Sequence, residues 1–221
     1  MKLEAFVPDG DAPRYFGVHP AIVTDIVDKD SLGRIEVKFP CLGADGADVR
    51  VWATLLTPYA DDNQGFEILP AVDSQVVVAF EAGDLRRAYI LGACWNGQEQ
   101  LPQTPEEANN KRLIKTRSGS LLEFDDTSGA AKVTISMRSG HTLVLDDGAQ
   151  EVKLVHANGC MIRLNIAGQV SITANSTVEI NASAVNIHSP TAIFDGIIKC
   201  TSLIADAVVS SAYTPGVGNV W

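Results

Sequence analysis

The first half of the chain alternates apolar and polar side chains in short runs, with turn residues between them. Successive side chains of a β-strand point to opposite faces, so this period of two predicts half-buried strands. A turn is expected at Asp28–Gly33, between the first two runs. Five such strands are the content of a small closed barrel. The predicted strands are Val18–Val27, Arg34–Phe39, Val49–Leu56, Gln75–Phe80 and Ala88–Leu91.

The stretch Gly97–Asn110 interrupts this pattern. It holds two prolines and mostly polar side chains, a composition typical of a linker. The linker is too short to contain a catalytic domain.

Beyond the linker the sequence repeats. The pairs Ser118-Gly119, Ser139-Gly140 and Asn158-Gly159 align, 21 and 19 residues apart. Apolar residues stand three and five positions after each glycine, and a second glycine and a second alternating run follow. Each repeat therefore predicts a turn, a strand, a turn and a strand. The second glycines are Gly129, Gly148 and Gly168, and the second runs are Val133/Ile135, Val152/Leu154 and Val170/Ile172.

From about Gly168 the repeat shortens. The pairs Val170/Ile172, Val178/Ile180 and Val185/Ile187 recur every 8 and 7 residues, among Ser, Thr, Asn and Ala. Low-complexity disorder is the alternative, but regular β-branched pairs argue against it. The pattern predicts an ordered β-helix.

A strand with apolar residues at alternate positions has one face to bury. The short apolar pairs are too few to fill the interior of a single-chain solenoid. A single-chain solenoid remains the alternative structure. Three chains around one axis share their apolar pairs and remove exposed edges. The sequence thus predicts a homotrimer. Its axis core is expected to be Leu122, Phe124, Leu143, Leu145, Ile162, Leu164, Val170, Ile172, Val178, Ile180, Val185 and Ile187.

Composition narrows the classes of function. Hydrophobic residues make up 46% of the 221 residues, but no run approaches the roughly 18 that a membrane helix needs. The start, Met1-Lys2-Leu3-Glu4, has an acid where a signal peptide is apolar, so assembly in the cytoplasm is expected. A net charge of −10 argues against nucleic acid as a partner.

The cysteines do not form a metal or disulfide pattern. Cys41, Cys94, Cys160 and Cys200 are far apart, with no CxxC motif, and are interpreted as reduced, small core residues.

Candidate chemistry is sparse, and we predict no enzyme, no catalytic residue, no cofactor and no metal. Asp125-Asp126 and Asp146-Asp147 resemble a pair of glycosidase carboxylates, but they occupy equivalent repeat positions, where Asp favours turns. The histidines are isolated in the sequence and form no HxH motif; a threefold ring of His188 in a trimer is the alternative that we do not favour. They are His19, His141, His156 and His188.

Several segments of the first half resemble the OB domain of contractile-tail spikes, in order and spacing from about residue 16 to 98. The resembling family is phage baseplate assembly protein V, related to VgrG of type VI secretion. The segments are Phe16-Gly17-Val18, Val23–Asp28, Gly33–Pro40, Trp52-Ala53, Gly65-Phe66, Leu69–Phe80, Gly83-Asp84 and Ala88–Gly92.

The resemblance implies an all-β chain: an N-terminal OB-fold barrel and then a trimeric, triple-stranded β-helix needle. It also implies a membrane-piercing spike in the baseplate of a phage tail or tail-like particle, assembled in the bacterial cytoplasm and aimed at a host cell envelope. The expected divisions are an arm at 1–15, the OB domain at 16–98, a linker at 99–110, the spike at 111–207 and an apex tail at 208–221.

Two departures from the family bear on partners. VgrG proteins carry a hub region before the OB domain, and about 15 residues precede it here. A separate baseplate hub protein is therefore expected, which favours a phage tail or tail-like particle. Some related spikes also insert a lysozyme domain, for which the linker is too short.

The end of the chain, Val208–Trp221, breaks the repeat with Pro215 and two glycines. It leaves Val217, Val220 and Trp221 as predicted apex residues. Either this tail folds over the tip or a separate PAAR-like tip protein caps it, and we favour the cap because three exposed tryptophans would be adhesive.

Two other functions are weighed. A receptor- or polysaccharide-binding tail fibre needs an exposed aromatic groove, and a β-helical polysaccharide-degrading enzyme needs convergent acids on one face. The aromatic residues after the linker are Phe124, Phe194, Tyr213 and Trp221.

Overall fold

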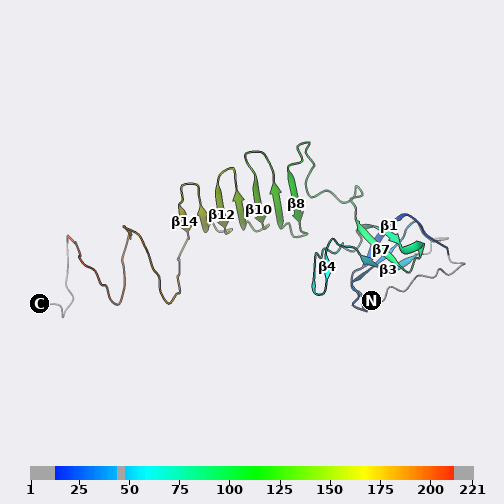
Figure 1. The fold of residues 1–221 in the computed structure, drawn as a ribbon, viewed down its shortest axis with the longest axis horizontal. Coiled ribbons are helices and arrows are strands. Elements are labelled where there is room, and N and C mark those ends of the chain that lie inside the picture. Colours follow the sequence, from blue (N-terminus) through cyan, green and yellow to red (C-terminus); the bar gives the residue numbers. More distant parts are fainter. Residues whose placement is uncertain (1–12, 44–47, 212–221) are drawn as a thin grey trace.

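The computed structural model of the chain describes residues 13–43 and 48–211. Figure 1 shows a small barrel near the N-terminus, a row of strands lying side by side beyond it, and a winding trace toward the C-terminus. The described residues contain one helical element, the single 3₁₀ turn η1. The all-β class predicted from the alternating pattern is therefore confirmed.

Five strands form the closed barrel, in the order β1-β2-β3-β7-β6. Four of the pairings are antiparallel, and β3 runs parallel to β7. Each strand lies within two residues of its predicted bounds, because turn residues delimit every alternating run. The strands are β1 (Val18–Asp25), β2 (Arg34–Lys38), β3 (Arg50–Leu55), β6 (Gln75–Phe80) and β7 (Ala88–Ala93).

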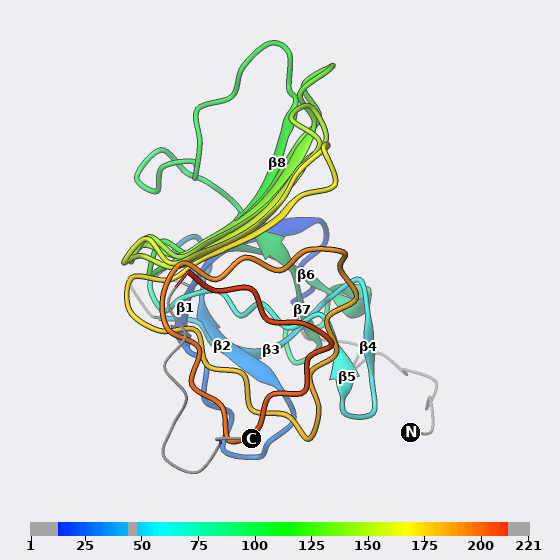
Figure 2. The ribbon, with the colours of Figure 1, turned by 90° about the vertical axis from the view of Figure 1, so that its left-hand side faces the viewer.

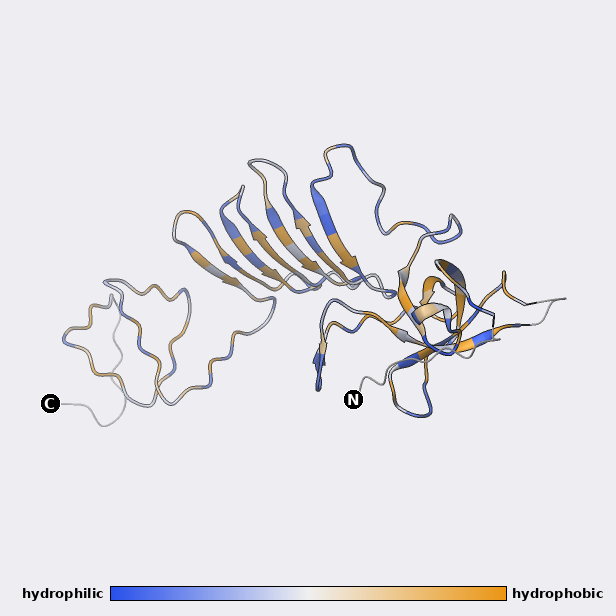
Figure 3. Ribbon diagram, turned by 45° about the vertical axis from the view of Figure 1, so that its right-hand side comes forward, coloured by the Kyte–Doolittle hydropathy of each residue, from blue (hydrophilic) through white to orange (hydrophobic). Residues whose placement is uncertain are grey.

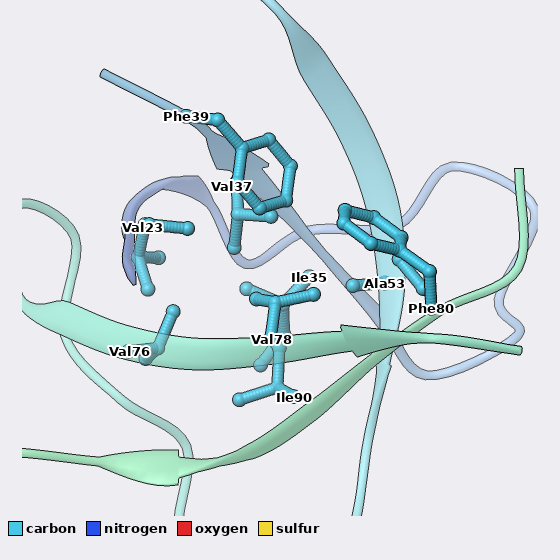
Figure 4. Packing of buried hydrophobic residues seen from close by; sticks show 11 residues of the cluster. Val23, Ile35, Val37, Phe39, Ala53, Val76, Val78, Phe80 and Ile90 are labelled. Atoms are coloured by element: carbon cyan, nitrogen blue, oxygen red, sulfur yellow. The ribbon is translucent and has the colours of Figure 1, made fainter. Parts of the chain in front are cut away.

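The core of the barrel consists of the inward members of each alternating run. Figure 4 shows these side chains converging from the strands, with Val78 and Ile90 side by side and the rings of Phe39 and Phe80 nearby. The two phenylalanine ring centroids are 5.4 Å apart. Complete burial of such a side chain contributes roughly 1.5–3 kcal/mol, so this cluster is the main source of barrel stability. Its members are Ala21, Val23, Ile35, Val37, Phe39, Ala53, Val76, Val78, Phe80, Ala88 and Ile90.

The chain enters the barrel beside η1 (Glu81–Gly83). The Tyr15 N–H donates to the Gly83 carbonyl at 3.0 Å, and Gly83 has a φ of +80°. A Cβ at Gly83 would lie 3.1 Å from the Arg14 Cβ and 3.2 Å from the Tyr15 nitrogen. Glycine is therefore required here both for its backbone conformation and for the close approach of the entering chain.

A short hairpin stands away from the barrel (Figure 1). It comprises β4 (Ala60–Asp61) and β5 (Gln64–Gly65), which pair only with each other. The hairpin adds no strand to the barrel.

The repeats after the linker form a seven-stranded sheet. Each strand pairs antiparallel with its neighbours in the sequence, so the sheet is a meander. A single chain therefore forms an open sheet here and not the coils of a β-helix; the predicted strands and turns are present, but closure is not. The strands are β8 (Lys111–Lys115), β9 (Leu121–Asp125), β10 (Lys132–Ser136), β11 (Thr142–Asp146), β12 (Glu151–Val155), β13 (Met161–Leu164) and β14 (Val170–Thr173).

Residues 174–211 contain no strand pairing within the chain. In Figure 2 this segment, orange to red, loops around in front of the barrel, and in Figure 1 it zigzags along the long axis. It thus advances as a coil, although no second coil of the same chain lies close enough to pair with it. All of its side chains are exposed, including Ile197 at 98% and Ile204 at 99%.

The prediction that the cysteines are core residues is wrong. Cys41 and Cys200 are exposed, Cys94 and Cys160 are partly buried, and all four are free thiols. Cys41 lies in the turn after β2, and Cys200 lies in residues 174–211, which we call the unpaired segment. Neither position faces the barrel core.

The turn after β1 depends on one carboxylate. Asp28 accepts hydrogen bonds from the backbone N–H groups of Asp30 and Leu32, at 3.0 and 3.1 Å. The guanidinium of Arg34 also donates to both oxygens, at 2.8 and 2.9 Å. Hydrogen bonding from Arg34, followed by that from the turn backbone, holds the pKa of Asp28 well below its ordinary value.

We expect Asp28→Asn to lower the urea midpoint of barrel unfolding at neutral pH. A depressed folded-state pKa stabilises the fold above the unfolded pKa of about 3.9, and this contribution is lost as the pH falls toward the folded pKa. The difference between wild type and variant should therefore shrink below about pH 4. Tryptophan fluorescence across a urea series at several pH values measures it. A difference that stays constant with pH would contradict the assigned role of the Asp28 charge.

Candidate assembly surface

The sheet carries most of its apolar residues on one face, which the register identifies because directly opposed residues of paired strands point to the same side. The pairing places Phe124 opposite Val133 and Val133 opposite Leu145, and this row continues across the sheet. A second row begins with Ile114 opposite Leu122. We call the two rows together the apolar face: Ile114, Leu122, Phe124, Val133, Ile135, Leu143, Leu145, Val152, Leu154, Ile162, Leu164, Val170 and Ile172.

No residue within 13–43 and 48–211 covers the apolar face. Phe124 is 44% exposed, Leu154 is 51% exposed and Val170 is 63% exposed. Figure 3 shows the alternation of hydrophobic and hydrophilic residues along these strands, in orange and blue. A continuous exposed apolar surface of this length marks an interaction site.

The predicted axis residues divide into two groups. The eight from Leu122 to Ile172 all lie on the apolar face, as their common spacing requires. The other four, Val178, Ile180, Val185 and Ile187, lie in the unpaired segment and are exposed. The apex residues Val217, Val220 and Trp221 lie outside the described residues.

The prediction missed five members of the apolar face. They are Val133 and Ile135 of β10, Val152 and Leu154 of β12, and Ile114 of β8. The first four come from the second run of each repeat, whose identical spacing of two residues was the available signal. Ile114 precedes the first repeat, so no repeat position marks it.

The opposite face, which we call the charged face, carries ion pairs across strands. Glu151 on β12 contacts Lys153 of its own strand and Arg163 of β13. The Lys153 ammonium, and then the Arg163 guanidinium, hold the pKa of Glu151 below its ordinary value. Asp125 lies opposite both Lys111 and Lys132, so charges of opposite sign face each other. These pairs give each strand a register that apolar contacts alone would not specify.

The acidic pairs hold turns, as their repeat positions indicate. Asp125 accepts from the Thr127 N–H at 3.0 Å, and Asp146 accepts from the Ala149 N–H at 2.8 Å. Hydrogen bonds from the Thr127 side chain and backbone lower the pKa of Asp125. A low pKa suits an anionic turn residue and does not suit a general acid.

Two histidines that are separate in the sequence meet in the fold. The ring centroids of His141 and His156 lie 4.3 Å apart. His141 ends the turn between β10 and β11, and His156 begins the turn between β12 and β13. Each Nδ1 accepts a backbone N–H, from Ala157 and Asn158 respectively. Within residues 13–43 and 48–211, no group of three or more His, Cys, Asp or Glu side chains is arranged to hold a metal ion. In that same part of the chain, no helix is long and apolar enough to span a membrane.

The barrel defines the class of this domain. Residues 19–95, which cover the barrel strands, match the family model of the type VI secretion system and phage-baseplate injector OB domain. The resemblance seen in the sequence is therefore confirmed for this part of the chain.

Two curated relatives extend the similarity. The type VI secretion system spike protein VgrG3 of Vibrio cholerae serotype O1 is 21% identical over 130 residues, or 56% of this chain and 13% of the relative. The type VI secretion system spike protein VgrG5 of Pseudomonas aeruginosa is 24% identical over 112 residues, or 48% and 14%. The chain thus resembles VgrG-like and baseplate spike proteins, and matches only a small part of the length of these relatives.

The two faces of β11 provide a matched pair of variants. We expect Leu145→Asp to prevent self-association, because it places a charge on the apolar face, whereas Val144→Asp should be tolerated. Val144 lies on the charged face opposite Lys153, which would pair with the new carboxylate. Burying one unpaired carboxylate costs several kcal/mol, enough to dissociate an assembly that buries it. Light scattering of both variants measures the mass, and equal masses for the two would show that the apolar face is not the interface.

Proposed function

We propose that the chain is the structural spike of a contractile injection particle, a phage tail or a related tail-like device, and that it functions as a homotrimer. The observation that carries this proposal is the uncovered apolar face directly following an injector-type OB barrel. The spike transmits force through a membrane and performs no chemical step.

A trimer accounts for both the apolar face and residues 174–211 better than a dimer does. In a dimer, two flat sheets would bury their apolar faces against each other, and residues 174–211 would still lack pairing partners. In a trimer, three sheets enclose a triangular interior into which Leu145, Leu164 and their row neighbours point. Closure by threefold rotation gives a finite assembly with no free sheet face.

The unpaired segment supports the same arrangement. Backbone groups that leave water need hydrogen-bond partners, and this segment has none in its own chain as strand pairing. Two further chains winding in parallel with it would supply both the missing ladder and the cover for Val178, Ile180, Val185 and Ile187. The segment then forms the triple-stranded β-helix of the needle.

Partners follow from the resemblance to the spike family. The barrels would form a collar that docks on a baseplate hub protein, and a PAAR-like protein would cap the tip. The host cell envelope is the target. We favour this reading over a tail fibre because Phe124 points into the apolar face and so cannot line an outer binding groove.

The oligomeric state is the first test. Light scattering of the purified chain should give three times 23.6 kDa, and the band should resist SDS unless boiled, because interlocked chains unfold slowly. Electron microscopy should show one shaft with three globular domains at its base. A stable monomer or dimer at micromolar concentration would overturn the proposal.

A second test concerns the tip. A PAAR-like protein from the same locus should bind the purified trimer, and truncation after residue 207 should abolish that binding while the trimer persists. Binding that survives this truncation would place the contact elsewhere. A map in which the chain's own end closes the tip would remove the need for a cap.

A further inference from the structure

An Asn-Gly pair, Asn96-Gly97, lies just after β7, where the barrel leads into the linker, and a second such pair lies at Asn158-Gly159 between β12 and β13. Glycine after asparagine leaves the following backbone nitrogen sterically open to the asparagine side chain. The two pairs share this feature, but the fold treats them differently.

Asn96 has a side-chain carbonyl with two hydrogen-bond donors. Its Oδ1 accepts the N–H groups of Gln98 and Glu99, at 2.9 and 3.3 Å. Both donors draw electron density away from the carbonyl carbon, as paired N–H donors do in an oxyanion hole. Gly97 is exposed, with nothing within 4 Å of its ideal Cβ position. Among residues 13–43 and 48–211, its N–H has no hydrogen-bond acceptor.

Asn158 has the same sequence but a protected nitrogen. The Gly159 N–H donates to the His156 carbonyl at 2.9 Å inside a tight hairpin turn. The Asn158 Oδ1 accepts a single N–H, from Cys160 at 3.0 Å. Before the Gly159 nitrogen can react, its bond to His156 must break.

Asn165 shares the polarised side-chain carbonyl of Asn96 but is not followed by glycine. Its Oδ1 accepts two N–H groups, from Ala167 and Gln169, both at 3.1 Å, so its carbonyl is polarised like that of Asn96. The next residue is Ile166, whose branched Cβ blocks the approach of its own nitrogen. Of these three residues, only Asn96 combines an unhindered, unbonded backbone nitrogen on the next residue with a side-chain oxygen that accepts two hydrogen bonds.

We propose that Asn96 is a site of spontaneous deamidation. Hydroxide removes the proton of the Gly97 N–H, and that nitrogen attacks the Asn96 Cγ to form a new C–N bond. The Cγ–Nδ2 bond then breaks and ammonia leaves, taking a proton from water. Water opens the resulting five-membered imide at either carbonyl, which yields aspartate or isoaspartate. The reaction needs no oxidant or reductant.

The modification changes the junction between barrel and sheet. It adds one negative charge per chain, three residues before Glu99. In isoaspartate the Cβ of residue 96 becomes part of the main chain, which adds one methylene to the backbone between residues 96 and 97. The linker would then lengthen and carry more charge as the protein ages. This inference is independent of the oligomeric state.

The test follows three peptides in one protein. The intact chain is held in mildly alkaline buffer, digested under mildly acidic conditions and analysed by mass spectrometry for amide-to-acid conversion. We expect the Asn96 peptide to convert about tenfold faster than the Asn158 peptide, the cost of breaking one hydrogen bond, with Asn165 slowest. The rate should rise with pH, and isoaspartyl methyltransferase should label the product.

Two controls make the result decisive. In urea, the Asn96 and Asn158 peptides should convert at similar rates, because both precede glycine. Asn96→Gln should abolish conversion of that peptide, and Gly97→Ala should slow it. Equal rates for the two Asn-Gly pairs in the folded chain, or an Asn96 that converts only in urea, would overturn the proposal.

Discussion

The central constraint is that a single-layered sheet with one apolar face cannot remain uncovered in water. The row that contains Leu154 runs from β8 to β14 and the row that contains Phe124 from β9 to β14, and no described residue forms a second layer on them. A stable domain needs two packed layers around a core. The barrel meets this requirement alone by closing on itself, whereas in the proposed trimer the sheet obtains its second layer from the other copies.

The amino-acid pattern predicted the barrel well because its strands bury their alternate residues within one chain. Val23, Val37 and Val78 are inward members of alternating runs, and all three are fully buried. The parallel pairing of β3 with β7 was beyond the pattern, since alternation marks a face and not a partner. The same limit applies to the sheet. Leu143 and Leu154 each belong to an apolar pair that the sequence marks, but the register that places them opposite each other depends on contacts between strands.

The candidate surface was predicted in part for a similar reason. The first pair of each repeat follows a glycine at fixed spacing and was readily found, whereas Val133 and Val152 belong to the returning strands. The meeting of His141 and His156 has no sequence signal, because it depends on adjacent hairpin turns. Residues 174–211 contain no strand pairing against which a pattern could be checked. The alternating valines and isoleucines there indicate strands, and in the proposed trimer their partners belong to the other chains.

The direction of the strands also determines how the sheet responds to force. β8 to β14 lie across the long axis, so their hydrogen bonds run along it (Figure 1). Compression along the axis pushes neighbouring strands together, and each pair of strands resists it along its whole length. A pull on one end of the sheet loads the outermost strand pair first, and a meander then separates strand by strand. The sheet is therefore stiffer against compression along this axis than against a pull at its end.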